Sequence, residues 1–120
     1  MDRETLVVTR TGEVVGAHVE RARSHWERMR GLLGRDGLAP GGGMRFDGTN
    51  SIHMAFMRFP IDVLYLDREW RVVKLVHALP PWRFSAARRA KLTIELPAGT
   101  LRALDIRAGD QIEARPAEAS

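Results

Sequence analysis

The apolar residues near the start of the chain fall into two short segments on either side of a glycine, a pattern typical of two β-strands joined by a turn. Segments 5–9 and 13–19 are rich in β-branched residues, and they flank Gly12. Glycine is the residue preferred where a hairpin turn requires a positive φ. The pattern therefore predicts a β-hairpin over 5–19 with Gly12 in its turn.

The middle of the chain predicts a second pair of strands. Segment 61–66 is mainly apolar on both faces, as expected of a central strand. The chain is expected to turn at Asp67-Arg-Glu and to return as a strand over 70–76. A preceding strand over 51–57 is expected to end before Pro60, because proline cannot donate to a strand ladder.

The last third of the chain alternates between apolar and polar residues over 91–96. We expect its apolar positions to face the core and its polar positions, Glu95 among them, to face solvent. A short helical turn near 100–104 and a turn at Gly109-Asp110 are expected to precede a final strand over 111–115. The tail 116–120 is expected to be frayed.

The periodicity changes near residue 22, where apolar residues recur at intervals of three and four. They are Ala22, Trp26, Met29 and Leu33. Ser24 followed by Glu27 is a capping-box pattern. We therefore expect one amphipathic helix near residues 24–34, which places its apolar stripe in the core.

Two long segments are expected to be loops. Residues 34–50 contain six glycines and one proline, and residues 77–90 contain Pro80-Pro81-Trp82. Long loops in compact domains are frequently functional, although a simple solvent loop explains the same pattern.

Together these segments predict a mainly β (α+β) fold. We expect a single domain over 1–120, since the length is near that of one domain. The natural arrangement for about seven short strands with hairpin connections is a small antiparallel β-sandwich or a partly closed barrel, with the one helix near residues 24–34.

Composition narrows the class of protein. The chain has no cysteine, which excludes disulfide and thiolate chemistry and fits a reducing compartment. It shows no signal-peptide pattern and no apolar run of the length that crosses a membrane. We therefore expect a cytoplasmic protein with no membrane association.

The net charge is +4, with 19 basic and 15 acidic residues. Segments 21–35 and 81–91 each carry a local charge of +4. A basic surface favours an anionic partner. Neither segment has the layout of a known nucleic-acid module, so we interpret both as solvated arginine-rich surface and disfavour nucleic-acid binding.

Motifs for metals and phosphates are weak. The four histidines are not at ligand spacing, so no metal site is expected. Gly41-Gly-Gly43 lacks the Lys-Ser/Thr of a P-loop, and no nucleophile elbow is present. We expect no cofactor.

One segment, 50–62, concentrates polar side chains. It contains Asn50, His53, Arg58 and Asp62. Asp62 shares a strand face with Leu64 and Leu66, so it is expected to be buried and therefore paired or hydrogen-bonded. It is either a tuned acid or base, or a structural group that pairs with Arg58 or caps loop N–H groups.

Glu95 and His53 have the same two interpretations. His53 suits general acid–base chemistry because histidine titrates near neutrality, although a lone histidine is usually structural. A carboxylate pair would arise if Glu95 and Asp62 converged.

Four blocks of the sequence resemble a known family. The blocks are Glu27–Arg35, Ser51–Asp67, Ile94–Gly99 and Ile106–Asp110. In them the chain resembles the bacterial and archaeal family called domain of unknown function 192. The resemblance implies a mainly β fold and no stated activity. It marks Arg30, Gly31, His53, Met57, Arg58, Asp62, Glu95, Gly99 and Asp110.

Three functions stay open on this basis. The leading hypothesis is a small-ligand-binding domain with a polar site around residues 50–62, in a cleft beside loops 35–50 and 77–90. Its ligand would be small and polar or anionic, such as a saccharide or a nucleotide-like molecule, with stacking from Trp82 and Trp70. The candidate ligand-binding residues are Asn50, His53, Arg58, Asp62, Trp82 and Glu95.

The first alternative is a hydrolase-type enzyme that uses Asp62 and His53 as catalytic acid–base groups, which requires them within hydrogen-bond reach. The second is a protein-interaction module that uses the arginine-rich helix or a strand edge.

Overall fold

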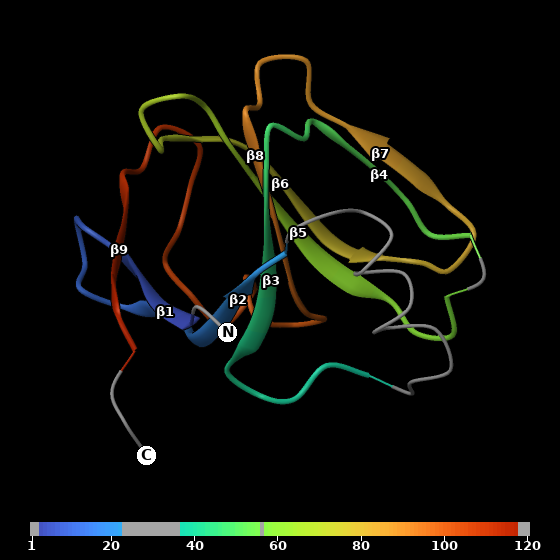
Figure 1. Ribbon diagram of the computed structural model, residues 1–120, viewed down its shortest axis with the longest axis horizontal. Helices are drawn as coiled ribbons and strands as arrows, with labels where there is room; N and C mark the ends of the chain where they lie inside the picture. The colour runs from blue at the N-terminus through green and yellow to red at the C-terminus, as the bar shows by residue number, and fades with distance from the viewer. Residues whose placement is uncertain (1–2, 23–36, 56, 118–120) are drawn as a thin grey trace.

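A computed structural model describes residues 3–22, 37–55 and 57–117 of the chain. These residues form nine strands (Figure 1): β1 (Arg3–Val8), β2 (Val14–Arg21), β3 (Gly42–Asp47), β4 (Ser51–His53), β5 (Ile61–Leu66), β6 (Val72–Leu79), β7 (Phe84–Ala86), β8 (Leu92–Pro97) and β9 (Ile112–Pro116). The fold is mainly β, as the sequence predicted.

Seven of these strands form one sheet in the order β6-β5-β8-β3-β2-β1-β9, and β4 pairs with β7 in a separate two-stranded sheet. Neighbours are antiparallel except β2 and β3, which run parallel. The expected antiparallel arrangement is therefore wrong for β2 and β3. The expected number of about seven strands is also too low, because the described residues form nine.

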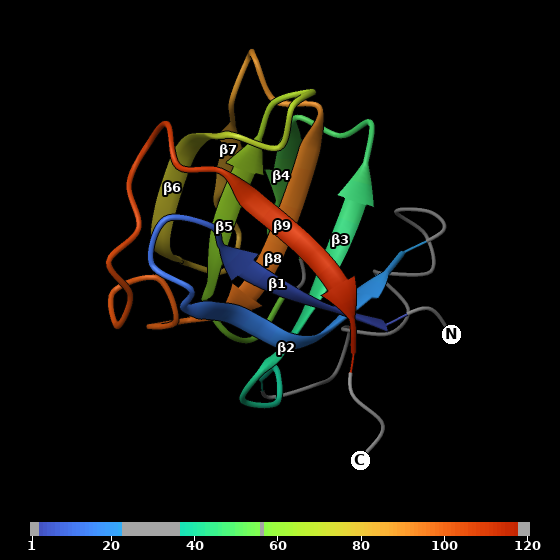
Figure 2. The ribbon, with the colours of Figure 1, turned by 90° about the vertical axis from the view of Figure 1, so that its left-hand side faces the viewer.

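The large sheet curls until its two edge strands meet at one end. An isolated bridge joins Arg71, just before β6, to Gln111, just before β9. The Ile112 N–H also donates to the Trp70 carbonyl at 2.9 Å. Strands β6 and β9 themselves are not paired with each other, so the sheet is not a closed barrel. Figure 2 shows β9, β1 and β2 crossing in front of β5, β8 and β3.

Strand alternation divides the core into two clusters. The inner face of the curled sheet packs Leu6, Val19, Leu64, Leu66 and Ile94 together with other apolar residues. The outer face of β5 packs Ile61, Val63 and Tyr65 beneath Ile52 and Met54 of the β4 region. The two-stranded sheet therefore covers the outer face of the large sheet, where apolar burial stabilises it.

Local sequence signals located several elements correctly. β1 and β2 form the expected hairpin, and Gly12 has the expected positive φ of 77°. β5 is buried along its full length and lies between β6 and β8, as predicted for a central strand. The turn at Gly109 also lies before the last strand, with a φ of 93°.

Other expectations need correction. Both predicted loops contain a strand: β3 lies within 34–50 and β7 lies within 77–90. The first strand before Pro60 ends at His53 and does not continue to residue 57. Short segments rich in glycine or proline carry too little periodicity to indicate such strands.

The amphipathic helix expected near residues 24–34 falls outside the described residues, and the described part of the chain contains no helix. Residues 118–120 of the tail also fall outside it. Across the described ranges, no helix has the length and apolar character required to cross a membrane.

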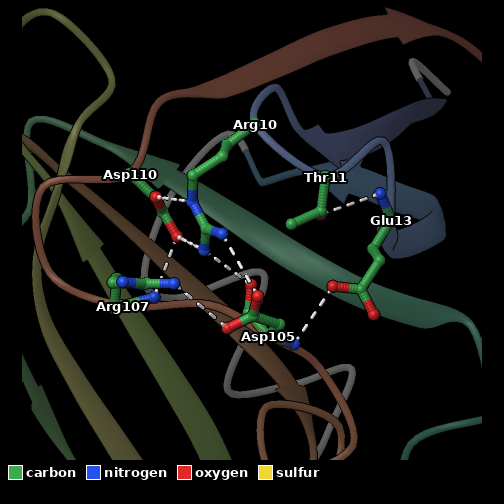
Figure 3. Close-up of polar contacts among 6 residues, drawn as sticks. All are labelled: Arg10, Thr11, Glu13, Asp105, Arg107 and Asp110. Carbon is green, nitrogen blue, oxygen red and sulfur yellow. Dashed lines mark hydrogen bonds and ion pairs between the residues drawn. The ribbon is translucent and has the colours of Figure 1, made fainter.

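A polar network fastens the β1–β2 turn to the segment before β9 (Figure 3). Arg10 Nε donates to Asp110 Oδ1 at 2.8 Å, and its Nη2 donates to Asp110 Oδ2 at 3.0 Å. Arg10 also contacts Asp105 through Nη1 at 3.1 Å. The Asp105 N–H donates to Glu13 across the same junction at 3.0 Å. The network joins residues about one hundred positions apart.

Acid should weaken this network. The hydrogen bonds from Arg10 lower the pKa of Asp110 to about 2, below its ordinary value of 3.8. A carboxylate with a lowered folded-state pKa contributes stability above its unfolded-state pKa and loses it as the pH falls through the folded-state pKa. We expect Arg10→Gln to lower the melting temperature by several degrees at pH 7, and this difference to shrink between about pH 4 and pH 2.

Differential scanning calorimetry across that pH range checks the expectation. Arg102→Gln is the control, because Arg102 is exposed and makes no ion pair with a described residue. A constant difference between wild type and Arg10→Gln down to pH 2 would contradict the assignment to Asp110.

Candidate functional site

The paired strands β4 and β7, with Met54 and the turn at 80–83, form a two-stranded surface that we call the β4–β7 ribbon. His53 lies opposite Phe84, and Ile52 lies opposite Ser85. Ile52 and Ser85 are buried against the large sheet, whereas His53 and Phe84 are exposed. Alternation therefore presents one histidine and one aromatic side chain outward as a cross-strand pair. In Figure 1 the ribbon lies well away from β1 and β9.

The turn that enters β7 holds Trp82 beside β4. The Trp82 N–H donates to the Met54 carbonyl at 2.7 Å, and the Met54 N–H donates to the Arg83 carbonyl at 2.7 Å. Trp82 has a φ of 68°, in the left-handed region. That conformation is strained for a bulky residue and persists where surrounding contacts enforce it, often at functional sites. The two backbone bonds to Met54 hold the strained turn in place.

Trp82 and Phe84 are unusually exposed for large apolar residues. Their exposed fractions are 64% and 68%, and Val14 at 48% is the one other large apolar side chain classed as exposed in the described ranges. Exposed aromatic groups that lie close together mark binding surfaces more often than isolated ones do. Both exposed large aromatic side chains of the described structure therefore lie on this ribbon.

The ribbon and the segments that flank it in sequence carry positive charge. Residues 50–60 and 80–91 contain five cationic residues and no acidic residue. They are Arg58, Arg83, Arg88, Arg89 and Lys91. All five are exposed. This concentration of positive charge beside exposed aromatic rings favours an anionic ligand over a neutral one.

Three of the predicted site residues meet at this surface. His53 and Trp82 belong to the ribbon, and the Asn50 carbonyl accepts a hydrogen bond from Ala87 just after β7 at 2.9 Å. Arg58 is exposed on the connection from β4 to β5. Trp70 lies elsewhere, with the Arg45 guanidinium 4.7 Å from its ring centroid. The expectation that Trp70 supplies stacking at the same site is not supported by this placement.

Asp62 is buried and its carboxylate caps backbone N–H groups. Oδ1 accepts from the Ala78 N–H and Oδ2 accepts from the Leu101 N–H, both at 2.8 Å. The sequence predicted burial with a hydrogen-bonded carboxylate, and the structure shows the backbone-capping arrangement. Both oxygens are thereby engaged in joining β6 and the turn at 98–101 to β5.

Glu95 is fully buried on β8, so the expectation that it faces solvent is wrong. It lies on the outer face of the large sheet with Tyr65, whose hydroxyl donates to Ser85 Oγ at 3.0 Å. Burial raises the pKa of Tyr65; the bond to Ser85 lowers it and the charge of Glu95 raises it. Thr93, on the same face, is also buried and donates to the Thr49 carbonyl at 2.7 Å. Glu95 and Thr93 are buried because apolar residues pack against both faces of the large sheet.

The carboxylates do not converge. Asp62 lies opposite Leu96 and Glu95 lies opposite Val63, so the two side chains point to opposite faces of the sheet. His53 is exposed on the outside of the ribbon, whereas Asp62 packs toward Leu101 on the inner face. The acid–base pair required by the hydrolase hypothesis is therefore not assembled in the described structure. In the same residues, no group of three or more metal-binding side chains gathers.

Several residues of this region were not singled out from sequence. Arg83 and Phe84 directly follow Trp82, so aromatic and basic residues alternate here. This pattern is typical of an exposed strand, but it becomes interpretable only when β7 has been located. Tyr65 and Ser85 meet across two sheets, and no local spacing reveals that contact.

The fold thus defines a β-domain made of a curled mixed sheet with a basic, aromatic ribbon on its outer face. The DUF192 family model, described as "Uncharacterized ACR, COG1430", matches residues 6–114. The chain belongs to this family, as the four sequence blocks predicted.

Sequence relatives of the chain include UPF0127 proteins. The chain is 44% identical over 64 residues to a UPF0127 protein of Pyrococcus furiosus, covering 52% of this chain and 54% of the relative. A UPF0127 protein of Thermococcus gammatolerans is 35% identical over 113 residues, covering 89% of this chain and 73% of the relative. The match therefore spans about half of the Pyrococcus protein and nearly three quarters of the Thermococcus one.

Among solved structures, a Sinorhizobium meliloti protein described as a candidate transcription regulator has a TM-score of 0.78 and 27% identity, covering 94% of this chain and 92% of that one. A Novosphingobium aromaticivorans protein of unknown function has a TM-score of 0.75 and 24% identity, with 92% and 83% covered. The second likeness shows the fold alone.

Proposed function

We propose that the chain is a small-ligand-binding β-domain whose ligand is a nucleotide-like molecule, an anion that carries an aromatic base. The observation that carries the proposal is the presence of two exposed aromatic side chains, Trp82 and Phe84, in a region whose segments 50–60 and 80–91 contain five exposed cations and no acidic residue. Aromatic faces stack on bases, and arginines bind phosphate.

The ribbon favours a nucleotide over a saccharide. Both ligands stack on aromatic rings, but only the nucleotide carries the negative charge that five exposed cations attract. His53 and Asn50 supply polar contacts at the same surface. Asp62 and Glu95 are buried, so in this proposal they support the strands beneath the ribbon and do not touch the ligand. The lack of cysteine favours a cytoplasmic location, and the length favours one domain.

Equilibrium titration with adenosine 5′-monophosphate tests the proposal. Adenosine and ribose 5-phosphate serve as matched probes that retain only the base or only the phosphate. We expect Trp82→Ala to weaken binding of the nucleotide by about tenfold or more, since stacking is worth about 1–3 kcal/mol per base. Both partial probes should bind more weakly than the nucleotide.

Two variants separate stacking from charge. Arg83→Gln should weaken binding of the nucleotide and of ribose 5-phosphate but leave the affinity for adenosine unchanged. Arg102→Gln, on an exposed turn outside the ribbon, should change none of the three affinities. A nucleotide that fails to bind, or that binds Trp82→Ala as tightly as wild type, would overturn the proposal.

A further inference from the structure

A concave surface lies on the outer face of β2, β1 and β9, which we call the β1 groove. Its volume is about 360 Å³, and its lining includes Thr5, Val7, Val14, Ala17, His18 and Arg115. Figure 2 shows β9 and β1 nearest the viewer, with β4 and β7 behind the large sheet. The groove is therefore separate from the β4–β7 ribbon.

The groove combines apolar surface with positive charge. Val14 supplies most of the apolar surface because its side chain is 48% exposed, whereas Val7 lies at the floor of the groove and is 2% exposed. No lining residue is acidic, while Arg115 and His18 bring nitrogen donors to the rim. Arg115 binds Glu113 through Nε and Nη2, and both bonds use one oxygen of that carboxylate. Nη1 makes no hydrogen bond with a described residue and remains available to an anion.

A β-bulge directs two neighbouring side chains of β2 into the groove. Glu4 pairs with Val19 and Leu6 pairs with Gly16, so Ala17 and His18 together oppose the single residue Thr5. In a regular strand, consecutive side chains point to opposite faces. Here both Ala17 and His18 line the groove.

The bulge is held by a specific hydrogen bond. Thr5 Oγ1 donates to the Ala17 carbonyl at 2.8 Å, which fixes the extra residue against β1. Bulges commonly re-aim side chains beside binding sites. The same distortion that directs His18 into the groove also places Ala17 there. A side chain larger than alanine at this position would fill the groove.

We propose that the β1 groove binds a small monocarboxylate with a short aliphatic chain. The volume lies at the lower end of the range for ligand pockets, which suits a small acid. The valine surface takes the aliphatic chain, and Arg115 with His18 takes the carboxylate. This site is independent of the ligand assigned to the ribbon.

An NMR titration with hexanoate tests the proposal, with hexan-1-ol as the probe that keeps the chain and lacks the charge. We expect hexanoate to shift the amide signals of Thr5, Val14 and His18. Hexan-1-ol should bind about tenfold more weakly or worse, because it lacks the negative charge that hydrogen-bonds to Arg115.

Three variants identify the site. Arg115→Gln should weaken hexanoate binding by about tenfold and leave hexan-1-ol binding unchanged. Ala17→Leu should prevent binding of both probes. Trp82→Ala should leave hexanoate binding as in wild type. Equal affinities for the two probes, hexanoate binding unaffected by Arg115→Gln, or signal changes confined to other strands would overturn the proposal.

Discussion

Replacing Asp62 with alanine is expected to lower the free energy of unfolding by about 2–6 kcal/mol. The substitution leaves the N–H groups of Ala78 and Leu101 without their acceptor. A hydrogen bond to a charged group contributes about 1.5–3 kcal/mol, and the loss is largest at the buried Leu101 N–H and smaller at Ala78, which is an exposed residue. Because natural domains are stable by only about 5–15 kcal/mol, the variant should lose a large part of its stability.

Asp62→Asn should have a smaller effect. Its amide oxygen replaces one acceptor, but its amino group faces the second N–H, so about half of the loss is expected. Asp67→Ala is the matched control, because Asp67 Oδ1 also accepts from two backbone N–H groups, at Glu69 and Arg71, in an exposed turn. There water replaces the lost acceptor.

Urea denaturation of the three variants measures these differences, with equal m-values as the check that the same transition is compared. The expected order of destabilisation is Asp62→Ala, then Asp62→Asn, then Asp67→Ala. A loss for Asp62→Ala no larger than that for Asp67→Ala would contradict the capping role of the buried carboxylate.

Gly43→Ala is expected to destabilise the chain by about 3 kcal/mol or more. A Cβ at this position would lie 2.7 Å from the Glu95 carbonyl oxygen and 3.0 Å from Leu96 Cδ2. The nearer contact is backbone of β8, which cannot move without separating β3 from β8. Since overpacking already costs about 1–3 kcal/mol where side chains can yield, a backbone clash should cost at least as much.

Gly37→Ala provides the control for this glycine. A Cβ at Gly37 meets nothing within 4 Å, and its φ is not in the left-handed region. We expect its melting temperature to remain within about a degree of wild type, as for surface substitutions that touch nothing. Equal melting temperatures for the two alanine variants would contradict the close approach of β3 to β8.

Local patterns were sufficient to predict the elements whose burial and turn chemistry lie in neighbouring residues. The β1–β2 hairpin follows from two β-branched segments around Gly12, and β5 follows from an apolar segment before a turn. In each case the residues that decide the structure are within a few positions of one another.

Elements that depend on distant partners were missed. β3 is rich in glycine and is a strand because β2 and β8 flank it, with Val19 opposite Gly43 and Ile94 opposite Arg45. β7 has three residues and is defined by its pairing with β4. Sequence periodicity cannot register pairing partners that lie tens of residues away.

The candidate site was predicted in part for the same reason. Segment 50–62 attracted attention because of its polar residues, but strand alternation distributes them: His53 lies on the exposed face of the β4–β7 ribbon, and Asp62 lies on the inner face of the large sheet. Glu95 was expected in solvent because its strand alternates, yet the β4–β7 ribbon covers that face. The bulge that turns His18 into the β1 groove has no sequence signal.

Nucleotide binding at the β4–β7 ribbon is tested most directly by an NMR titration of the isotopically labelled chain with adenosine 5′-monophosphate, in which the Trp82 indole and the His53 and Phe84 amides are followed. We predict saturable shifts at these three positions and none at the Trp70 indole, which lies against Arg45. Shifts that are absent, or that fall on Trp70 and leave the β4–β7 ribbon unchanged, would contradict it.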